Sequence, residues 1–148
     1  MIILVNVFTV IGTFLFMEFV AWATHKYIMH GLLWNLHEDH HVVNKNHRFQ
    51  KNDFFFLIFA IPSILLIYFG YHEFTIGFFI GLGILLYGLA YFVVHEIIIH
   101  RRIPPPKNTN SKYIKAIRMA HKVHHKSLKK EGCTNFGMLI VPLKYFKK

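Results

Sequence analysis

The chain has 148 residues, 54% of them hydrophobic and sixteen of them phenylalanine, a composition that is unusual for a water-soluble domain of this length. Its formal net charge is +10. A single cysteine, Cys133, excludes an internal disulfide and a cysteine-rich metal framework. We therefore expect one membrane-embedded domain that comprises residues 1–148.

Three apolar segments predict transmembrane helices. Residues 2–24 are interrupted only by Glu18, whereas residues 54–71 and 74–94 carry no charged side chain. Each segment is long enough to cross the hydrocarbon core, which takes about 17 to 25 helical residues. A fourth apolar stretch, residues 136–141, is too short to cross and is expected to be re-entrant or interfacial. The predicted fold is an all-α integral membrane protein with three transmembrane helices and helical extensions that carry histidines.

The basic residues predict the orientation of these helices. All seventeen Lys and Arg residues lie in two segments, four in residues 25–53 and thirteen in residues 101–148. Because cytoplasmic segments of membrane proteins are enriched in Lys and Arg, both segments are predicted to be cytoplasmic and the N-terminus to lie outside. This basic face can attract anionic lipids or an acidic protein partner, and we expect no nucleic-acid partner.

Ten of the twelve histidines form four clusters, and the spacing HX4H followed by HX2HH occurs twice. The clusters are His25 and His30; His37, His40 and His41; His95 and His100; and His121, His124 and His125. Each repeat begins at the predicted cytosolic end of a membrane span, so the four clusters are expected to converge just below the bilayer. His47 and His72 lie outside the pattern and are expected to be ordinary loop and turn residues.

The spacing of the clusters favours metal binding. In a helix, residues i, i+3 and i+4 spread over about 100° of one face, so three imidazoles of an HX2HH unit can point together. Residues i and i+5 lie about 140° apart, and the HX4H units therefore predict a helix end or a bulge. Ten imidazoles exceed the coordination of one metal ion, so a dinuclear centre is predicted.

Four carboxylates are candidates to bond the outer ring nitrogens of the metal ligands: Glu18, Asp39, Asp53 and Glu96. Glu18 lies within the first span, where a charged group costs about 2.5 kcal/mol or more, and it shares a helix face with His25 seven residues later. Alternatively, Glu18 bonds a neighbouring helix, Asp39 and Glu96 are solvated, and Asp53 caps the second span.

At these residues the chain resembles the fatty acid hydroxylase and carotenoid hydroxylase superfamily. HKYIMHG after the first span, KND at residues 51–53, YGLAYFVVHEIIIHRR, AHKVHH and CTNFG occur in an order similar to that of the bacterial β-carotene 3-hydroxylases. The resemblance extends from about residue 17 to residue 142. Two features depart from the family pattern: Glu96 stands where Asp is usual, and the connection RRIPPPKNTNSKY is short and rich in proline.

The resemblance implies that the ten clustered histidines hold two non-haem iron ions and that the metal centre alone is catalytic. It also implies O2 as co-substrate and hydroxylation of β-carotene at carbon 3 of each ring, giving β-cryptoxanthin and then zeaxanthin. The carotenoid would come from the lipid bilayer, in a bacterial inner membrane. Since the chain has no dinucleotide-binding motif, electrons are expected from an external source, and the resemblance implies a ferredoxin-type donor with its reductase.

Histidine spacing alone leaves other oxygenases open, namely a carotenoid ketolase, a sterol or fatty-acid hydroxylase, and a desaturase. A membrane metal-binding or transport protein is a more distant alternative. Transport predicts ligands at the middle of the membrane, whereas these histidines cluster after the spans on one side.

Overall fold

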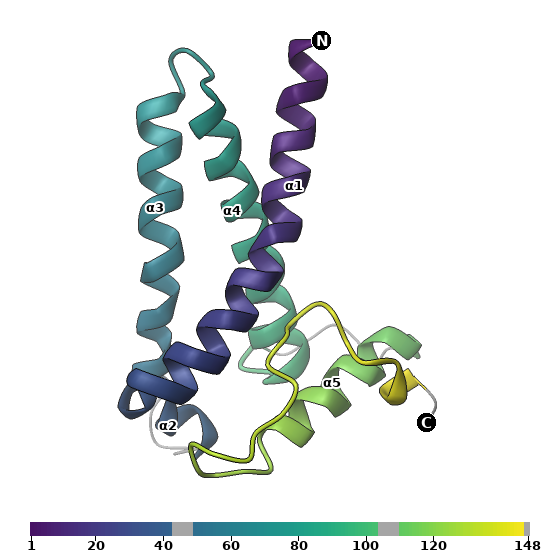
Figure 1. The fold of residues 1–148 in the computed structure, drawn as a ribbon. Coiled ribbons are helices and arrows are strands. Elements are labelled where there is room, and N and C mark those ends of the chain that lie inside the picture. The colour runs from purple at the N-terminus through teal and green to yellow at the C-terminus, as the bar shows by residue number, and fades with distance from the viewer. Residues whose placement is uncertain (43–48, 104–109, 147–148) are drawn as a thin grey trace.

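The computed structural model describes residues 1–42, 49–103 and 110–146, and the described part is helical without a strand (Figure 1). The elements in chain order are α1 (Ile2–Ala23), the π-helix η1 (Thr24–Leu32), α2 (Trp34–His41), the 3-10 helix η2 (Lys51–Phe54), α3 (Phe55–Gly70), α4 (Ile76–Phe92), the π-helix η3 (Val93–Ile99), α5 (Lys112–His124) and the 3-10 helix η4 (Leu143–Phe146). The prediction of an all-α fold is confirmed.

Within the described residues, three continuous helical segments are long and apolar enough to span a membrane: Ile2–Leu32, Lys51–Gly70 and Ile76–Ile99. Most of their large apolar side chains face outward, as Phe8, Ile64 and Phe69 do. Such a surface is unfavourable in water and matches a lipid environment. The prediction of three membrane spans is therefore confirmed.

Helix α4 lies between α1 and α3 and packs against both of them (Figure 1). Two glycines allow these close approaches. A Cβ atom on Gly81 would lie 2.8 Å from the Ile67 side chain of α3, and a Cβ atom on Gly83 would lie 2.6 Å from Thr13 of α1. The Ser63 hydroxyl adds a 2.9 Å hydrogen bond to the Gly81 carbonyl. The central helix thus positions the C-terminal ends of α1 and α4, where η1 and η3 continue with the HX4H units.

The elements that carry histidines gather at one end of the three spans (Figure 1). The amphipathic helix α5 begins after Ser111, whose hydroxyl accepts a 3.4 Å hydrogen bond from the Ile114 amide. Its buried face contains Ala116, Ile117 and Ala120 together with histidines, while most of its lysines are exposed. This burial pattern orients the HX2HH unit of α5 toward the ends of the spans.

The chain after α5 returns to the first span and packs against it. The backbone amides of Met138, Leu139 and Ile140 each donate a 2.9 Å hydrogen bond to Oε1 of Glu18, and the Tyr87 hydroxyl donates a 2.7 Å bond to Oε2. The short apolar stretch, residues 136–141, therefore packs beside α1 at the level of Glu18, a position compatible with both the re-entrant and the interfacial expectation. Because the chain returns to the helix bundle here, we call these residues the re-entrant segment.

Candidate metal centre

The two HX4H units lie on π-helices, which explains how residues five apart can share a face. The His100 amide donates to the His95 carbonyl at 2.9 Å, an i to i+5 bond of the kind that defines this helix. The ring centroids are 4.5 Å apart for His95 and His100 and 5.2 Å apart for His25 and His30. The expected departure from α-helical geometry at both units is confirmed.

The HX2HH units occupy ordinary α-helices, where residues i, i+3 and i+4 already lie on one face. Their side chains are removed from solvent: His37 and His40 are each 1% exposed and His124 is 0% exposed. Burial of so many polar rings is unfavourable unless their nitrogens form hydrogen bonds or bind a metal ion.

Among the residues that the structure describes, nine histidines form two groups, each with ligand nitrogens within 4.8 Å of one another. The first group is His25, His30, His37, His41 and His124, and the second group is His40, His95, His100 and His121. Both groups combine residues from three motifs, so each needs the span ends, α2 and α5 together. His125 stands between them, with ring centroids 4.4 Å from His41 and 4.5 Å from His121.

The outer nitrogens of the first group all have oxygen partners. The Nδ1 atom of His37 lies 2.6 Å from the side-chain oxygen of Asn52. The other four Nδ1 atoms lie 2.8 to 3.2 Å from backbone carbonyl oxygens of the segment after α5. The pairs are His25 with Phe136, His30 with Lys130, His41 with Ser127, and His124 with Thr134. Each contact requires the proton on Nδ1, because a carbonyl oxygen can only accept.

The inner nitrogens then carry lone pairs that face one another. His37 Nε2 lies 3.2 Å from the Nε2 atoms of both His25 and His41, and the Nε2 atoms of His30 and His124 are also 3.2 Å apart. A neutral imidazole with its proton on Nδ1 has none on Nε2, so these contacts cannot be hydrogen bonds. A cation at the centre of the five nitrogens satisfies them, and the donor set therefore fits a metal ion.

The second group leaves similar unsatisfied nitrogens. The Nε2 atoms of His40 and of the adjacent His125 are buried and have no hydrogen-bond partner among the described residues. The Nε2 atoms of His100 and His121 are 2.9 Å apart. Imidazole nitrogens suit iron, copper, nickel or zinc, and these converging atoms fit a second metal ion.

Burial favours the neutral, metal-binding form of those histidines that lie outside the membrane spans. It lowers the pKa from the ordinary value of 6.5 to about 3 for His37, His100 and His124, to about 4 for His41 and to about 2 for His125. Mutual repulsion between neighbouring imidazolium charges contributes in the same direction. At neutral pH these rings are therefore uncharged.

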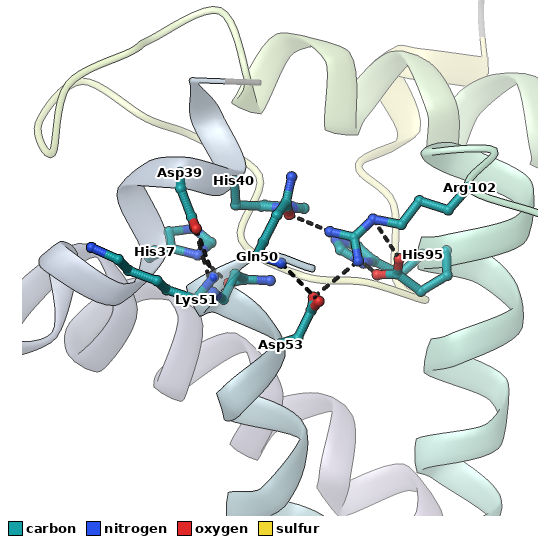
Figure 2. Close-up of polar contacts among 10 residues, drawn as sticks. His37, Asp39, His40, Gln50, Lys51, Asp53, His95 and Arg102 are labelled. Atoms are coloured by element: carbon teal, nitrogen blue, oxygen red, sulfur yellow. Dashed lines mark hydrogen bonds and ion pairs between the residues drawn. The ribbon is translucent and has the colours of Figure 1, made fainter. Parts of the chain in front are cut away.

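A polar network supports the second group, and Figure 2 shows it. His40 Nδ1 lies 2.9 Å from the side-chain oxygen of Gln50, and His95 Nδ1 lies 2.5 Å from Oε1 of Glu96. Arg102 contacts Glu96, Asp53 and Gln50. The outer nitrogens of these two rings are thus oriented by side chains, unlike the carbonyl contacts of the first group.

The four acids expected near the metal ligands occupy different positions. Glu96 contacts the His95 ring directly. Asp39 accepts from the Lys51 amide at 2.6 Å, and Asp53 accepts from the Gln50 amide at 3.0 Å, so both shape the turn that presents Gln50. Glu18 bonds Tyr87 of α4 and the re-entrant segment, which matches the alternative of a bond to a neighbouring helix.

The sequence pattern predicts no metal role for His47 and His72. His72 lies in the turn between α3 and α4, at the opposite end of the spans, with its ring 3.7 Å from that of Tyr71. His47 lies outside the described residues. His72 is thus a turn residue, as the sequence predicts.

Sequence reasoning missed the partners that orient the rings. Asn52 bonds His37, Gln50 bonds His40, and Arg102 joins Gln50 to Glu96. The only available signal was the KND segment, which contains Asn52. Backbone carbonyl partners leave no signature in side-chain identity, so the role of residues 127–136 could not be read from the sequence.

A cavity of about 620 Å³ lies beside the metal centre, between α1, α5 and the re-entrant segment. Its walls are mainly apolar and include Phe19, Trp22, Ile117 and Ile140, and His121 of the second group also lines it. The Phe136 ring forms another wall and packs 5.2 to 5.4 Å from the rings of His25, His30 and His124. An apolar molecule in this cavity would therefore lie against His121 of the second group and against the Phe136 ring, which covers three histidines of the first group.

The model of the fatty acid hydroxylase family matches residues 10–145. The chain belongs to this family. It is 42% identical over 137 residues to a β-carotene hydroxylase of Pantoea ananas, covering 93% of this chain and 78% of the relative. It is 41% identical over 140 residues to a β-carotene hydroxylase of Pseudescherichia vulneris, covering 92% and 77%. β-Carotene 3-hydroxylase 2 of Arabidopsis thaliana is 36% identical over 119 residues, covering 78% of this chain and 39% of that protein. No solved structure matches the chain.

Proposed function

We propose that this protein is a membrane-embedded β-carotene 3-hydroxylase with a histidine-bound di-iron centre. The observation that carries the proposal is the convergence of histidine ring nitrogens in two groups, at the end of three spans and beside an apolar cavity. The family and the names of its carotenoid-hydroxylating relatives support the same reaction.

The residues proposed to hold the two irons are the ten clustered histidines, with His125 between the two groups. Two bound iron ions would supply the O2-dependent oxidising power that amino-acid side chains lack. The protein keeps the rings neutral through burial and orients them through outward hydrogen bonds. An all-imidazole ligand set adds no negative charge, so Glu96 is the acid best placed to offset the charge of the second metal.

The cavity is the proposed binding site for the β-ionone ring of the substrate. Its apolar walls suit a hydrocarbon ring, and the rest of a carotenoid can remain in the bilayer because Leu15 and Phe19 of α1 line the cavity and are also exposed on the surface of the span. Phe136 separates the ring from three histidines of the first group and thereby excludes water from them. Repetition at the second ring would give zeaxanthin by way of β-cryptoxanthin.

The proposed orientation places the N-terminus outside and the histidines and C-terminus in the cytoplasm of a bacterium, within its inner membrane. A ferredoxin-type donor with its reductase would then reach the basic face that contains α5. Attraction to anionic lipids is a second use of the same charge.

The test is pigment chromatography of a β-carotene-producing host that expresses the parent chain or a His40→Ala, His124→Ala double variant, which removes one ligand from each group. We expect zeaxanthin from the parent and only β-carotene from the variant at equal expression. Unchanged β-carotene with the parent would reject the proposed substrate and direct the search to acyl and sterol substrates. A ketone at carbon 4 would identify a ketolase instead.

A further inference from the structure

Arg102 contacts two side chains, Glu96 and Gln50, that each contact a histidine ring of the second group (Figure 2). Glu96 connects His95 to Arg102: its Oε1 is 2.5 Å from His95 Nδ1, and its Oε2 is 3.0 Å from Arg102 Nε. Gln50 connects His40 to Arg102: its side-chain oxygen is 2.9 Å from His40 Nδ1 and also accepts a hydrogen bond from Arg102 Nη2. A single guanidinium group thus contacts the partners of two ligand rings.

A third contact fixes the guanidinium itself. Its Nη1 atom donates to Oδ1 of Asp53 at 2.9 Å, while Oδ2 of Asp53 accepts from the Gln50 backbone amide at 3.0 Å. The planar guanidinium therefore uses all three of its nitrogens, which a lysine ammonium cannot reproduce with the same geometry. Arg102 follows helix η3, whereas Gln50 and Asp53 lie in the turn before α3. Arg102 therefore connects two segments that are far apart in sequence.

We propose that Arg102 is a positioning residue for the second metal: it fixes Glu96 and Gln50 so that His95 and His40 present their Nε2 atoms to one ion. The inference rests on the proposed metal centre. The rings of the first group are oriented by backbone carbonyls and Asn52 instead, so Arg102 should affect one metal and spare the other.

The experiment is an anaerobic titration of the purified metal-free protein with Co²⁺, followed by its visible absorption, which reports coordination. We expect the parent to bind two equivalents. Arg102→Gln should bind the first with unchanged affinity and the second about 10-fold more weakly, in the range found when a partner of a ligand is lost. Arg102→Lys should recover part of that loss, because the charge next to Glu96 is kept. Arg118→Gln on α5 removes the same charge outside this network and should match the parent.

A double-variant cycle separates positioning from general destabilisation. If Arg102 acts through Glu96 and Gln50, Glu96→Gln combined with Arg102→Gln should weaken the second site by less than the product of the two single effects. Equal loss at both sites, an unchanged second site, or independent effects in the cycle would each overturn the inference. A parent that binds fewer than two equivalents would instead reject the proposed di-metal centre.

Discussion

Tyr87 on α4 donates a 2.7 Å hydrogen bond to Glu18 on α1, and this contact joins two membrane spans through a buried polar pair. The other oxygen of Glu18 accepts from three consecutive amides of the re-entrant segment. One carboxyl group therefore holds together three parts of the chain that are far apart in sequence.

Replacing Glu18 should release the re-entrant segment. Glu18→Leu leaves four donors without an acceptor, two of them buried and two part-buried, and a buried donor without a partner costs about 1 to 3 kcal/mol. We expect a loss of stability of about 3 kcal/mol or more, with faster hydrogen exchange at the amides of residues 138–140 measured by mass spectrometry. Tyr87→Phe removes one bond and should cost about 1 kcal/mol without changing that exchange. Equal exchange in Glu18→Leu and the parent would contradict the anchoring role.

The glycines of α4 should differ sharply in their tolerance of substitution. Gly83→Ala places a methyl group 2.6 Å from Thr13 Cβ and 2.9 Å from the Val10 carbonyl, so α1 and α4 must separate. We expect a loss of about 1 to 3 kcal/mol in unfolding measured in detergent. Gly88→Ala is the matched control, since no atom lies within 4 Å of its added Cβ, and higher helix propensity should leave stability equal or greater. A Gly83→Ala protein as stable as the parent would refute the tight contact.

The metal-free protein should lose stability as the pH falls below about 6.5. Burial lowers the pKa of His37, His100 and His124 to about 3 in the folded state, whereas in the unfolded chain these groups titrate near 6.5. The unfolded state then binds more protons between these values, so the free energy of unfolding decreases with decreasing pH. Melting temperatures from pH 8 to pH 4 test this, and a flat profile would contradict it. Bound metal should raise the whole curve, because it binds only the neutral rings.

Asn52 should affect the first metal through His37. Asn52→Leu removes the acceptor 2.6 Å from His37 Nδ1 and frees the ring to rotate or change tautomer. We expect the first-group affinity for Co²⁺ to fall about 10- to 100-fold, with the second site unchanged. Asn52→Asp keeps an oxygen acceptor and should retain most of the affinity. His72→Ala, at the other end of the spans, controls for loss of a histidine, and a weakened second site in Asn52→Leu would argue for a general disruption.

Much of the fold followed from local patterns, because apolar length predicts spans and HX4H spacing is incompatible with an undistorted α-helix. Local sequence patterns did not predict how the histidines divide between the two groups. Neighbouring residues His40 and His41 belong to different groups, and so do His121 and His124. That division depends on how α2 and α5 are rotated against the span ends, which is set by tertiary packing.

Glu18 shows a similar limit of sequence reasoning. It shares a helix face with His25, which suggested a role beside the metal ligands. Seven residues of helix correspond to a rise of about 10 Å, however, and at that level the carboxyl group meets Tyr87 and the returning chain instead. Only the path of residues 136–141, which no local pattern specifies, determines which partner it finds.

The carbonyl groups that orient the first histidine group have a consequence for how the protein is made. Four of its five rings take their outer partner from residues 127–136, a segment that leaves the ribosome after all three spans. Until that segment is synthesised, His25, His30 and His41 lack the contacts that fix their tautomers. The hydrogen-bonded form of the first histidine group is therefore completed late in biosynthesis, only after residues 127–136 have been added to the chain.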